Sequence, residues 1–175
     1  MGALIALVAL VVGISIVSPE FRTGSNFLSL LRQSSINGLI AFGMTCVILT
    51  DAIDLSVGSV LALSTALCAG MIANGVPAGA AMILALVIGT ALGAVSGFFV
   101  TKGRLQPFIA TLITMTVYRG VTMIFTDGKP ISNLGDSFVL KLVGRGNFYH
   151  IPIPVILLVL IFVGFYFLLN KTTFG

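Results

Sequence analysis

Long apolar runs separated by short polar segments dominate the chain. The runs contain almost no charged residues and are about 17–25 residues long, which is the length of helix that crosses a bilayer. We expect six such spans, over residues 1–17, 34–50, 55–73, 78–101, 105–125 and 151–169. None of these runs alternates apolar and polar residues as the strands of a membrane β-barrel do. The pattern therefore predicts an all-α, polytopic transmembrane helical bundle.

The segments between these runs differ in character. Residues 18–33 mix charged residues with Phe and Leu, a pattern typical of a short helix that lies in the membrane interface. Residues 126–150 are polar and Gly-rich, and a loop of this length often contacts a partner. The charged residues that form a candidate docking surface on this loop are Asp127, Lys129, Asp136, Lys141 and Arg145. The alternative for the loop is a solvated connector.

The composition also indicates an integral membrane protein. Apolar residues make up 58% of the 175 residues and charged residues 8%, against about 25% charged in ordinary soluble domains. No Asp, Glu, Lys or Arg occurs between residues 55 and 101. These values exclude an ordinary soluble domain and a disordered chain. The net charge of +4 comes from basic residues scattered between apolar runs, so it predicts contacts with a lipid bilayer and not with nucleic acid.

The chain shows no pattern of a catalytic or metal-binding site. Cys46 and Cys68 lie inside apolar runs without a CxxC motif, and we interpret both as buried small residues. His150 is the single histidine, which argues against a histidine-based metal site. The GxxxxGK[ST] motif of nucleotide-binding loops does not occur, so we expect ATP to bind to another chain. We predict no cofactor, no metal and no residue for covalent catalysis.

The most unusual stretch is Asp51–Ser59, in which two acidic residues separate two apolar runs. Charges at membrane depth usually face an aqueous path or a partner, and irregular backbone occurs at depth only where protein or water covers it. The stretch predicts either a helix break that lines a passage or a plain interhelical loop at one membrane face. A membrane aspartyl protease is disfavoured, because no second acidic residue lies within any span.

Two further features lie inside the spans. Gly89, Gly93 and Gly97 share one helix face, where small side chains let another helix approach closely. We interpret this face as a helix-packing surface, with a face that slides during transport as the alternative. Arg119 lies about 9 Å inside the end of its span. It is either a snorkelling anchor or part of an outer gate.

Several motifs in order resemble one family of transport proteins. They are INGLIAFGMTCVILTDAIDLSVGS (Ile36–Ser59), FIATLITMTVYRGVTMIFTDGKPI (Phe108–Ile131) and GRGNF (144–148), which is soon followed by IPIP (151–154). The chain resembles the permeases of monosaccharide ABC importers, and among them the ribose permeases most. The pair Asp51-Ala52 departs from the small residues that the family usually has there.

The resemblance implies partners, location and extent. It implies a permease that pairs with a second copy of itself, with cytoplasmic ABC ATPase subunits and with an extracytoplasmic sugar-binding protein. It implies a bacterial cell membrane and a cytoplasmic N-terminus, although the basic residues of the loops, counted alone, favour the opposite orientation. Family members are nearly twice as long, so residues 1–175 are expected to be the N-terminal part of a single permease domain.

The sequence therefore predicts a permease that moves a monosaccharide, ribose by resemblance, by alternating access. The candidate residues of the translocation path or its gates are Asn37, Asp54, Ser56, Gly58 and Arg119. One alternative is a transport-incompetent membrane fragment with an assembly or regulatory role. Another is a secondary carrier, which would require inverted repeats that we do not find in the sequence.

Overall fold

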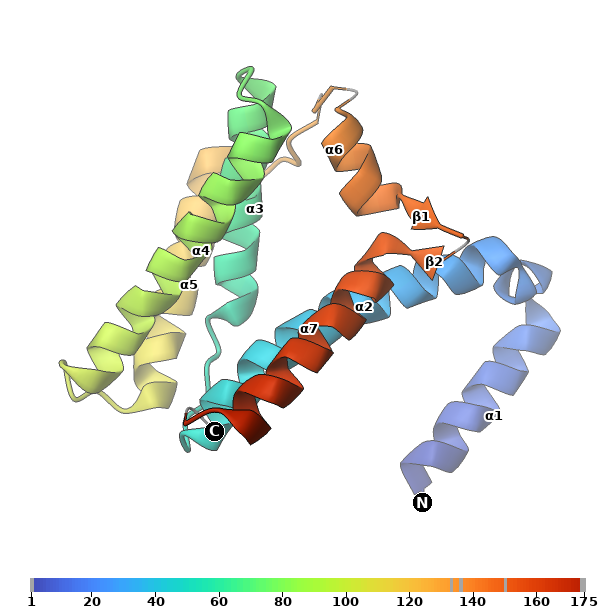
Figure 1. Ribbon diagram of the computed structural model, residues 1–175, viewed down its shortest axis with the longest axis horizontal. Coiled ribbons are helices and arrows are strands. Elements are labelled where there is room, and N and C mark those ends of the chain that lie inside the picture. Colours follow the sequence, from blue (N-terminus) through green and yellow to red (C-terminus); the bar gives the residue numbers. More distant parts are fainter. Residues whose placement is uncertain (1, 133, 136, 150, 174–175) are drawn as a thin grey trace. The chain divides into compact units, whose positions relative to one another are not determined.

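The computed structural model describes residues 2–132, 134–135, 137–149 and 151–173, and most of them are helical (Figure 1). The elements in chain order are α1 (Gly2–Val17), η1 (Pro19–Arg22), α2 (Gly24–Leu49), α3 (Val57–Ala73), α4 (Ala78–Thr101), α5 (Pro107–Thr126), α6 (Phe138–Leu140), η2 (Lys141–Arg145), β1 (Asn147–Phe148), β2 (Ile151–Pro152) and α7 (Ile153–Lys171). The predicted all-α class is confirmed.

Three helices of the described chain are long and apolar enough to cross a membrane: α4, α5 and α7. Helices α1 and α3 are also apolar but shorter. The expected span over 78–101 coincides with α4, and the break expected near Asp51–Ser59 is present between α2 and α3. The full set of six crossings stays a prediction.

The separate interfacial helix expected over residues 18–33 is wrong, because residues 24–49 form one continuous helix. A single 3-10 turn, Pro19–Arg22, separates α1 from this helix. Where α2 begins, the Thr23 hydroxyl accepts a hydrogen bond from the backbone N–H of Asn26 at 3.3 Å. Between residues 24 and 49 there is no proline to stop the helix. The hydroxyls of Ser29 and Ser35 donate to carbonyls one turn back, which lets polar residues remain helical.

The described chain divides into two compact units, residues 1–39 with 145–175 and residues 40–144. In the first unit, α2 packs closely on α7, since a Cβ built on Gly38 would lie 2.7 Å from Leu158 Cδ1. The Arg32 guanidinium donates to Asn147 Oδ1 at 2.8 Å. Strands β1 and β2 pair antiparallel as a short hairpin, so α7 begins at Ile153 and not at 151 as expected.

The turn before α2 carries the one acidic side chain of the first unit. The backbone of Glu20 and the Ser18 hydroxyl donate hydrogen bonds to its carboxylate, which lowers the pKa of Glu20 below its ordinary value. The side chain is fully exposed, so these bonds shape the turn and contribute little to overall stability.

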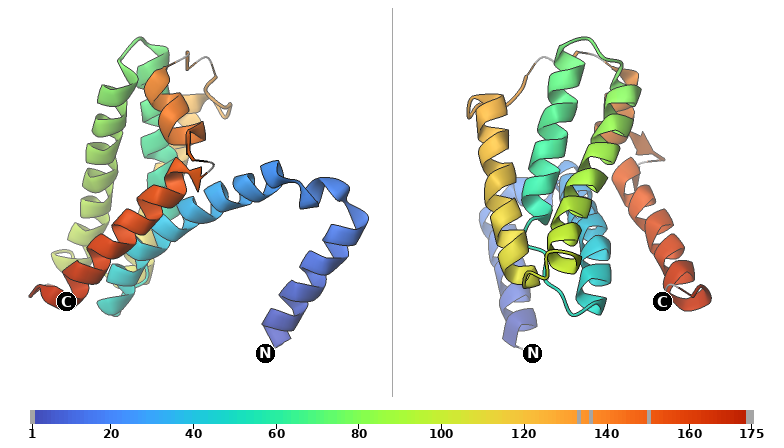
Figure 2. Two further views of the ribbon diagram at one scale, coloured as in Figure 1. Left: turned by 45° about the vertical axis from the view of Figure 1, so that its right-hand side comes forward. Right: turned by 90° about the vertical axis from the view of Figure 1, so that its left-hand side faces the viewer.

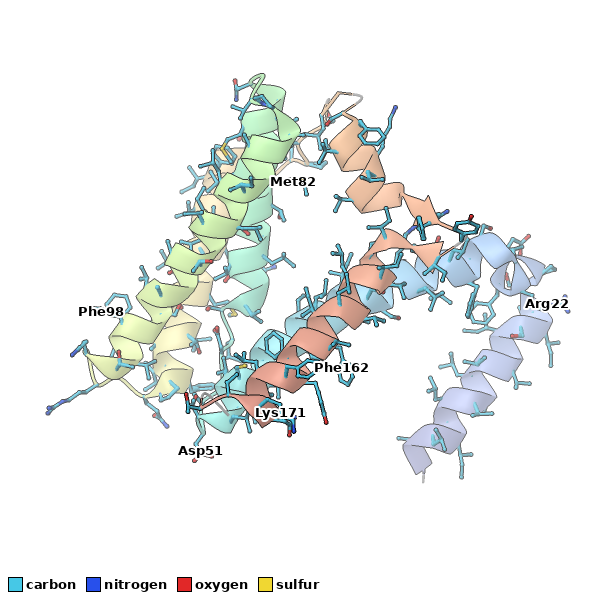
Figure 3. All side chains as sticks on the ribbon, viewed as in Figure 1. Arg22, Asp51, Met82, Phe98, Phe162 and Lys171 are labelled. Carbon is cyan, nitrogen blue, oxygen red and sulfur yellow. The ribbon has the colours of Figure 1, made fainter. Side chains whose placement is uncertain are left out.

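In the second unit, helices α3, α4 and α5 run side by side (Figure 2). Large apolar side chains such as Phe98, Leu86 and Ile124 are at least 60% exposed, and Figure 3 shows Phe98 pointing away from the neighbouring helices. The buried residues of these three helices are instead mostly small or hydroxylated: Ser59, Leu63, Ser64, Gly70, Ala78, Ala81, Ser96, Ala110, Thr111, Thr114 and Tyr118. This distribution is typical of a bundle that faces lipid and packs through small residues.

Glycines permit two close approaches in the second unit. A Cβ on Gly70 would lie 2.6 Å from the ring of Phe125, where α3 meets α5. A Cβ on Gly103 would lie 2.5 Å from the backbone carbonyl oxygen of Phe99, in the tight turn between α4 and α5. The second contact is with backbone, which cannot swing away as a side chain can.

Substitution Gly103→Ala should therefore destabilise the protein by about 1–3 kcal/mol, because the new methyl group strains the turn. The matched control is Gly120→Ala in α5, where a Cβ meets nothing within 4 Å and a helical alanine is favoured by roughly 0.5–1 kcal/mol. Thermal unfolding of the two variants in detergent micelles should show a lower midpoint for the first and an equal or higher midpoint for the second. Equal midpoints would contradict the strain.

Candidate functional site

The break between α2 and α3 is held by hydrogen bonds of a single carboxylate. Helix α2 ends at Leu49, and Asp51 lies in the turn that follows (Figure 3). Its φ of 54° is in the left-handed region. Asp54 Oδ1 accepts the backbone N–H of Ser56 at 2.7 Å and the Ser56 hydroxyl at 2.6 Å. This arrangement is an Asx turn, and it places a negative charge at the N-terminal end of α3.

Hydroxyl groups continue from the break into the bundle. The Ser56 and Ser96 oxygens lie 3.4 Å apart, and the Ser96 hydroxyl donates to Thr114 Oγ1 at 3.0 Å. The Thr111 hydroxyl donates to the carbonyl oxygen of Ile53 at 3.2 Å. These contacts join the break to α4 and α5 through buried groups, which we call the hydroxyl seam (Ser56, Ser96, Thr111 and Thr114).

A fourth contact lies further along the same helices. The Tyr118 hydroxyl donates to the backbone carbonyl oxygen of Leu92 at 2.9 Å, and the tyrosine is 7% exposed. Because Leu92 in α4 accepts a bond from a side chain of α5, the contact fixes these two helices to each other about one turn beyond the seam.

A cavity of about 230 Å³ lies beside the break. We call it the Asp54 cavity, and its lining residues are Val47, Thr50, Ala52, Ile53, Asp54, Gly93, Ser96, Gly97, Val100, Thr101, Pro107 and Thr111. The described residues provide no hydrogen-bond partner for Asp54 Oδ2, the oxygen that the Asx turn leaves over. The cavity is therefore lined by the Asp54 carboxylate, by hydroxyl-bearing residues and by small apolar residues, and no basic residue is among them.

The structure brings two of the predicted path residues together, Asp54 and Ser56. Gly58 is exposed in the first turn of α3, and Asn37 is exposed on the part of α2 that belongs to the other unit. Arg119 is exposed on α5, about 12 Å along the helix from Thr111. Among the described residues Arg119 has no ion pair, so the snorkelling and gate interpretations both stay open.

The predicted packing glycines differ in their surroundings. A Cβ on Gly89 would contact Ser64 of α3 at 3.7 Å, an ordinary packing distance. At Gly93 and Gly97 a Cβ would meet no atom within 4 Å, and both glycines line the Asp54 cavity. Because glycine has no side chain, these two positions leave the space of the cavity open.

The candidate docking residues are distributed along the segment after α5. Asp127 and Lys129 form an exposed ion pair at 3.2 Å. Lys141 and Arg145 bound a single π-helical turn, with Lys141 exposed. Asp136 and the side chain of Arg145 lie outside the described residues. Their role in docking stays a prediction.

Sequence reasoning missed Ser96, Thr111, Thr114 and Tyr118. The last three follow the spacing of one helix face, three and four residues apart, which signals a polar stripe on an otherwise apolar helix. Ser96 is preceded by four apolar or small residues and gives no comparable signal. A serine in an apolar helix donates equally well to its own backbone, so its partner on α5 is not visible in the sequence.

The helices expose apolar side chains, and their buried contacts contain a helix break and a seam of hydroxyl groups. These features define the class as a helical membrane protein. A family model described as "Branched-chain amino acid transport system / permease component" matches residues 26–175. The chain belongs to this permease family. Its members are transport components and not enzymes, which confirms that expectation.

Curated relatives refine the resemblance. The chain is 54% identical to the ribose import permease protein RbsC of Bacillus subtilis (strain 168), over 100% of this chain and 54% of that protein. The proteins of the same name from Haemophilus influenzae (strain ATCC 51907 / DSM 11121 / KW20 / Rd) and Escherichia coli (strain K12) are 45% and 43% identical, over 98% and 99% of this chain and 54% of each relative. The resemblance to monosaccharide importer permeases is thus confirmed.

The chain spans about half the length of these relatives and matches their N-terminal part. No solved structure matches the chain significantly.

The hydroxyl seam generates a stability prediction. Thr114→Val keeps the shape of the side chain but removes the acceptor that the Ser96 hydroxyl has on α5, which should cost about 0.6–2 kcal/mol, the range measured for hydrogen bonds between membrane helices. Thr116→Val is the matched control, because Thr116 is exposed and its hydroxyl donates only to Leu112 of its own helix. Unfolding midpoints in micelles should fall for the first variant alone. A similar fall for both would mean that the seam adds no stability.

Proposed function

We propose that this chain forms the N-terminal part of the membrane-spanning permease of an ATP-driven monosaccharide importer, with ribose as the sugar. The observation that carries the proposal is the 54% identity over the whole chain to a ribose import permease. Identity at this level over the full length of the chain supports a shared path as well as a shared fold.

The geometry gives this function a physical basis. The surfaces of α4 and α5 are mostly apolar and suit lipid, while the buried polar groups of these helices lie mainly in the hydroxyl seam beside the break. A neutral, hydroxyl-rich solute needs polar groups along its path, because each unpartnered hydroxyl in an apolar medium costs roughly 2–7 kcal/mol. Asp54 and Ser56 lie where such groups are needed, and we assign them to the path. Asn37, Gly58 and Arg119 are assigned to its wall or gates on the sequence prediction alone.

Partners follow from the class of transporter. ATP hydrolysis belongs to a separate ATPase subunit, and an extracytoplasmic sugar-binding protein delivers the sugar to the loop that carries Asp127, Lys129 and Lys141. A second copy of the permease completes the path in the bacterial plasma membrane, with the N-terminus in the cytoplasm. In this orientation the break and the turn at Lys102–Arg104 face the cytoplasm.

Replacement of the matching part of the Bacillus subtilis ribose permease by this chain tests the proposal, because the remaining part of the relative and its own partners are then present. We expect uptake of labelled ribose to be restored relative to a strain that lacks the permease, without competition from leucine. The chain expressed alone serves as the control and should insert into the membrane without restoring uptake.

Two results would refute the assignment. One is a chimaera that inserts fully but takes up no ribose. The other is a chimaera that takes up leucine, as the description of the family model allows, and not ribose.

A further inference from the structure

The size of the Asp54 cavity limits what it can hold. Its 230 Å³ correspond to about eight water molecules at about 30 Å³ each, and they lie below the roughly 300–1,000 Å³ of pockets for drug-sized ligands. The cavity therefore has room for a small molecule such as a single sugar ring.

The cavity is lined by both hydrogen-bonding and apolar side chains. Asp54 Oδ2 offers an acceptor, and the hydroxyls of Ser96 and Thr111, each 4% exposed, lie on the same cavity. Val47 and Val100 add apolar surface from α2 and α4. A sugar ring has hydroxyl groups at its edge and C–H groups on its faces. The polar side chains of the lining can bond to the hydroxyl groups, and the apolar side chains can contact the C–H groups.

Charge distinguishes a sugar from the obvious competitor. The family model's description refers to branched-chain amino acids, and an amino acid carries both an ammonium group and a carboxylate. The Asp54 carboxylate can pair with the ammonium group, but the cavity is lined by no Lys or Arg that could pair with the carboxylate of the amino acid. A neutral polyhydroxyl solute needs no such cation.

We propose that the Asp54 cavity is a monosaccharide subsite, at which the carboxylate of Asp54 accepts hydrogen bonds from sugar hydroxyls. The inference rests on the proposed function and assigns the substrate class to this one position. The hydroxyls of Ser96 and Thr111 already donate to protein acceptors. A hydrogen bond from either hydroxyl to a sugar would replace one of these bonds, so the net gain in free energy is small. The subsite therefore binds weakly, as release into the cytoplasm requires.

Filling the cavity is the first test. In the chimaera described above, Gly97→Leu places a side chain in the cavity, and its Cβ meets no atom within 4 Å. Ribose uptake should fall about tenfold, equivalent to 1.4 kcal/mol, with an unchanged amount of protein in the membrane. Gly120→Leu is the control, because Gly120 is equally unobstructed but lies outside the cavity, and it should retain normal uptake.

A binding measurement keeps the test independent of transport. Thr101→Cys introduces a thiol at the cavity in a chimaera from which Cys46 and Cys68 have been removed, and the same protein without Thr101→Cys gives the background. Ribose should slow alkylation of the introduced thiol by a small maleimide in purified protein, and leucine should not. Additional replacement Asp54→Ala should abolish this protection.

The outcomes separate the two proposals. Normal ribose uptake by Gly97→Leu, or alkylation that ribose does not slow, would overturn the subsite and leave the proposed function standing. Absence of ribose uptake by the unmodified chimaera would overturn the proposed function, while the alkylation experiment would still decide whether this cavity binds ribose.

Discussion

The structure of the second unit depends on how the backbone N–H and C=O groups of a non-helical segment find hydrogen-bond partners between apolar helices. Residues 50–56 leave the helical ladder, and a backbone N–H or C=O group that is shielded from water without a partner costs about 1–3 kcal/mol. The N–H groups of Thr50, Asp51 and Ala52 donate back to carbonyls of α2, and the Ser56 N–H donates to Asp54. The carbonyl of Ile53 accepts from Thr111 on α5. The break is therefore a built feature with its own partners, fixed to two neighbouring helices.

The same constraint explains what the interior is made of. Helices that expose Phe98 and Leu86 gain nothing from burying further large apolar groups against one another, because lipid tails are equally apolar. Contact is gained through small residues that bring backbones close, as at Gly70 against Phe125 and Gly89 against Ser64. The hydroxyls of Thr114 and Tyr118 lie where α5 meets α4, and the first accepts from Ser96 while the second donates to the carbonyl oxygen of Leu92. Polar residues thus become core residues of this bundle.

Much of the fold could be predicted from sequence because local signals determine where helices begin and end. Pro77 and Lys102 flank α4, Pro107 begins α5, and the acidic residues mark the break. The failure at residues 18–33 has a physical cause: their polar side chains suggested a separate interfacial element, yet serine hydroxyls that bond within α2 allow one helix to continue through them.

The candidate site was predictable only in part, since periodicity identifies a face but not what lies opposite it. Asp54 and Ser56 are close in sequence, and their interaction could be anticipated. Ser96 could not be placed, because its partner Thr114 lies 18 residues further along.

The glycine face on α4 shows the same limit. Gly89, Gly93 and Gly97 are equivalent by spacing, yet the first packs against Ser64 while the other two border the Asp54 cavity. A helix crosses its neighbour at an angle, so one continuous stripe of small residues can form contact at one end and open space at the other. In the proposed permease this difference has a use. The contact at Gly89 keeps α3 and α4 together, while the space at Gly93 and Gly97 accommodates a solute whose hydroxyls meet the Asp54 carboxylate and the hydroxyls of Ser96 and Thr111.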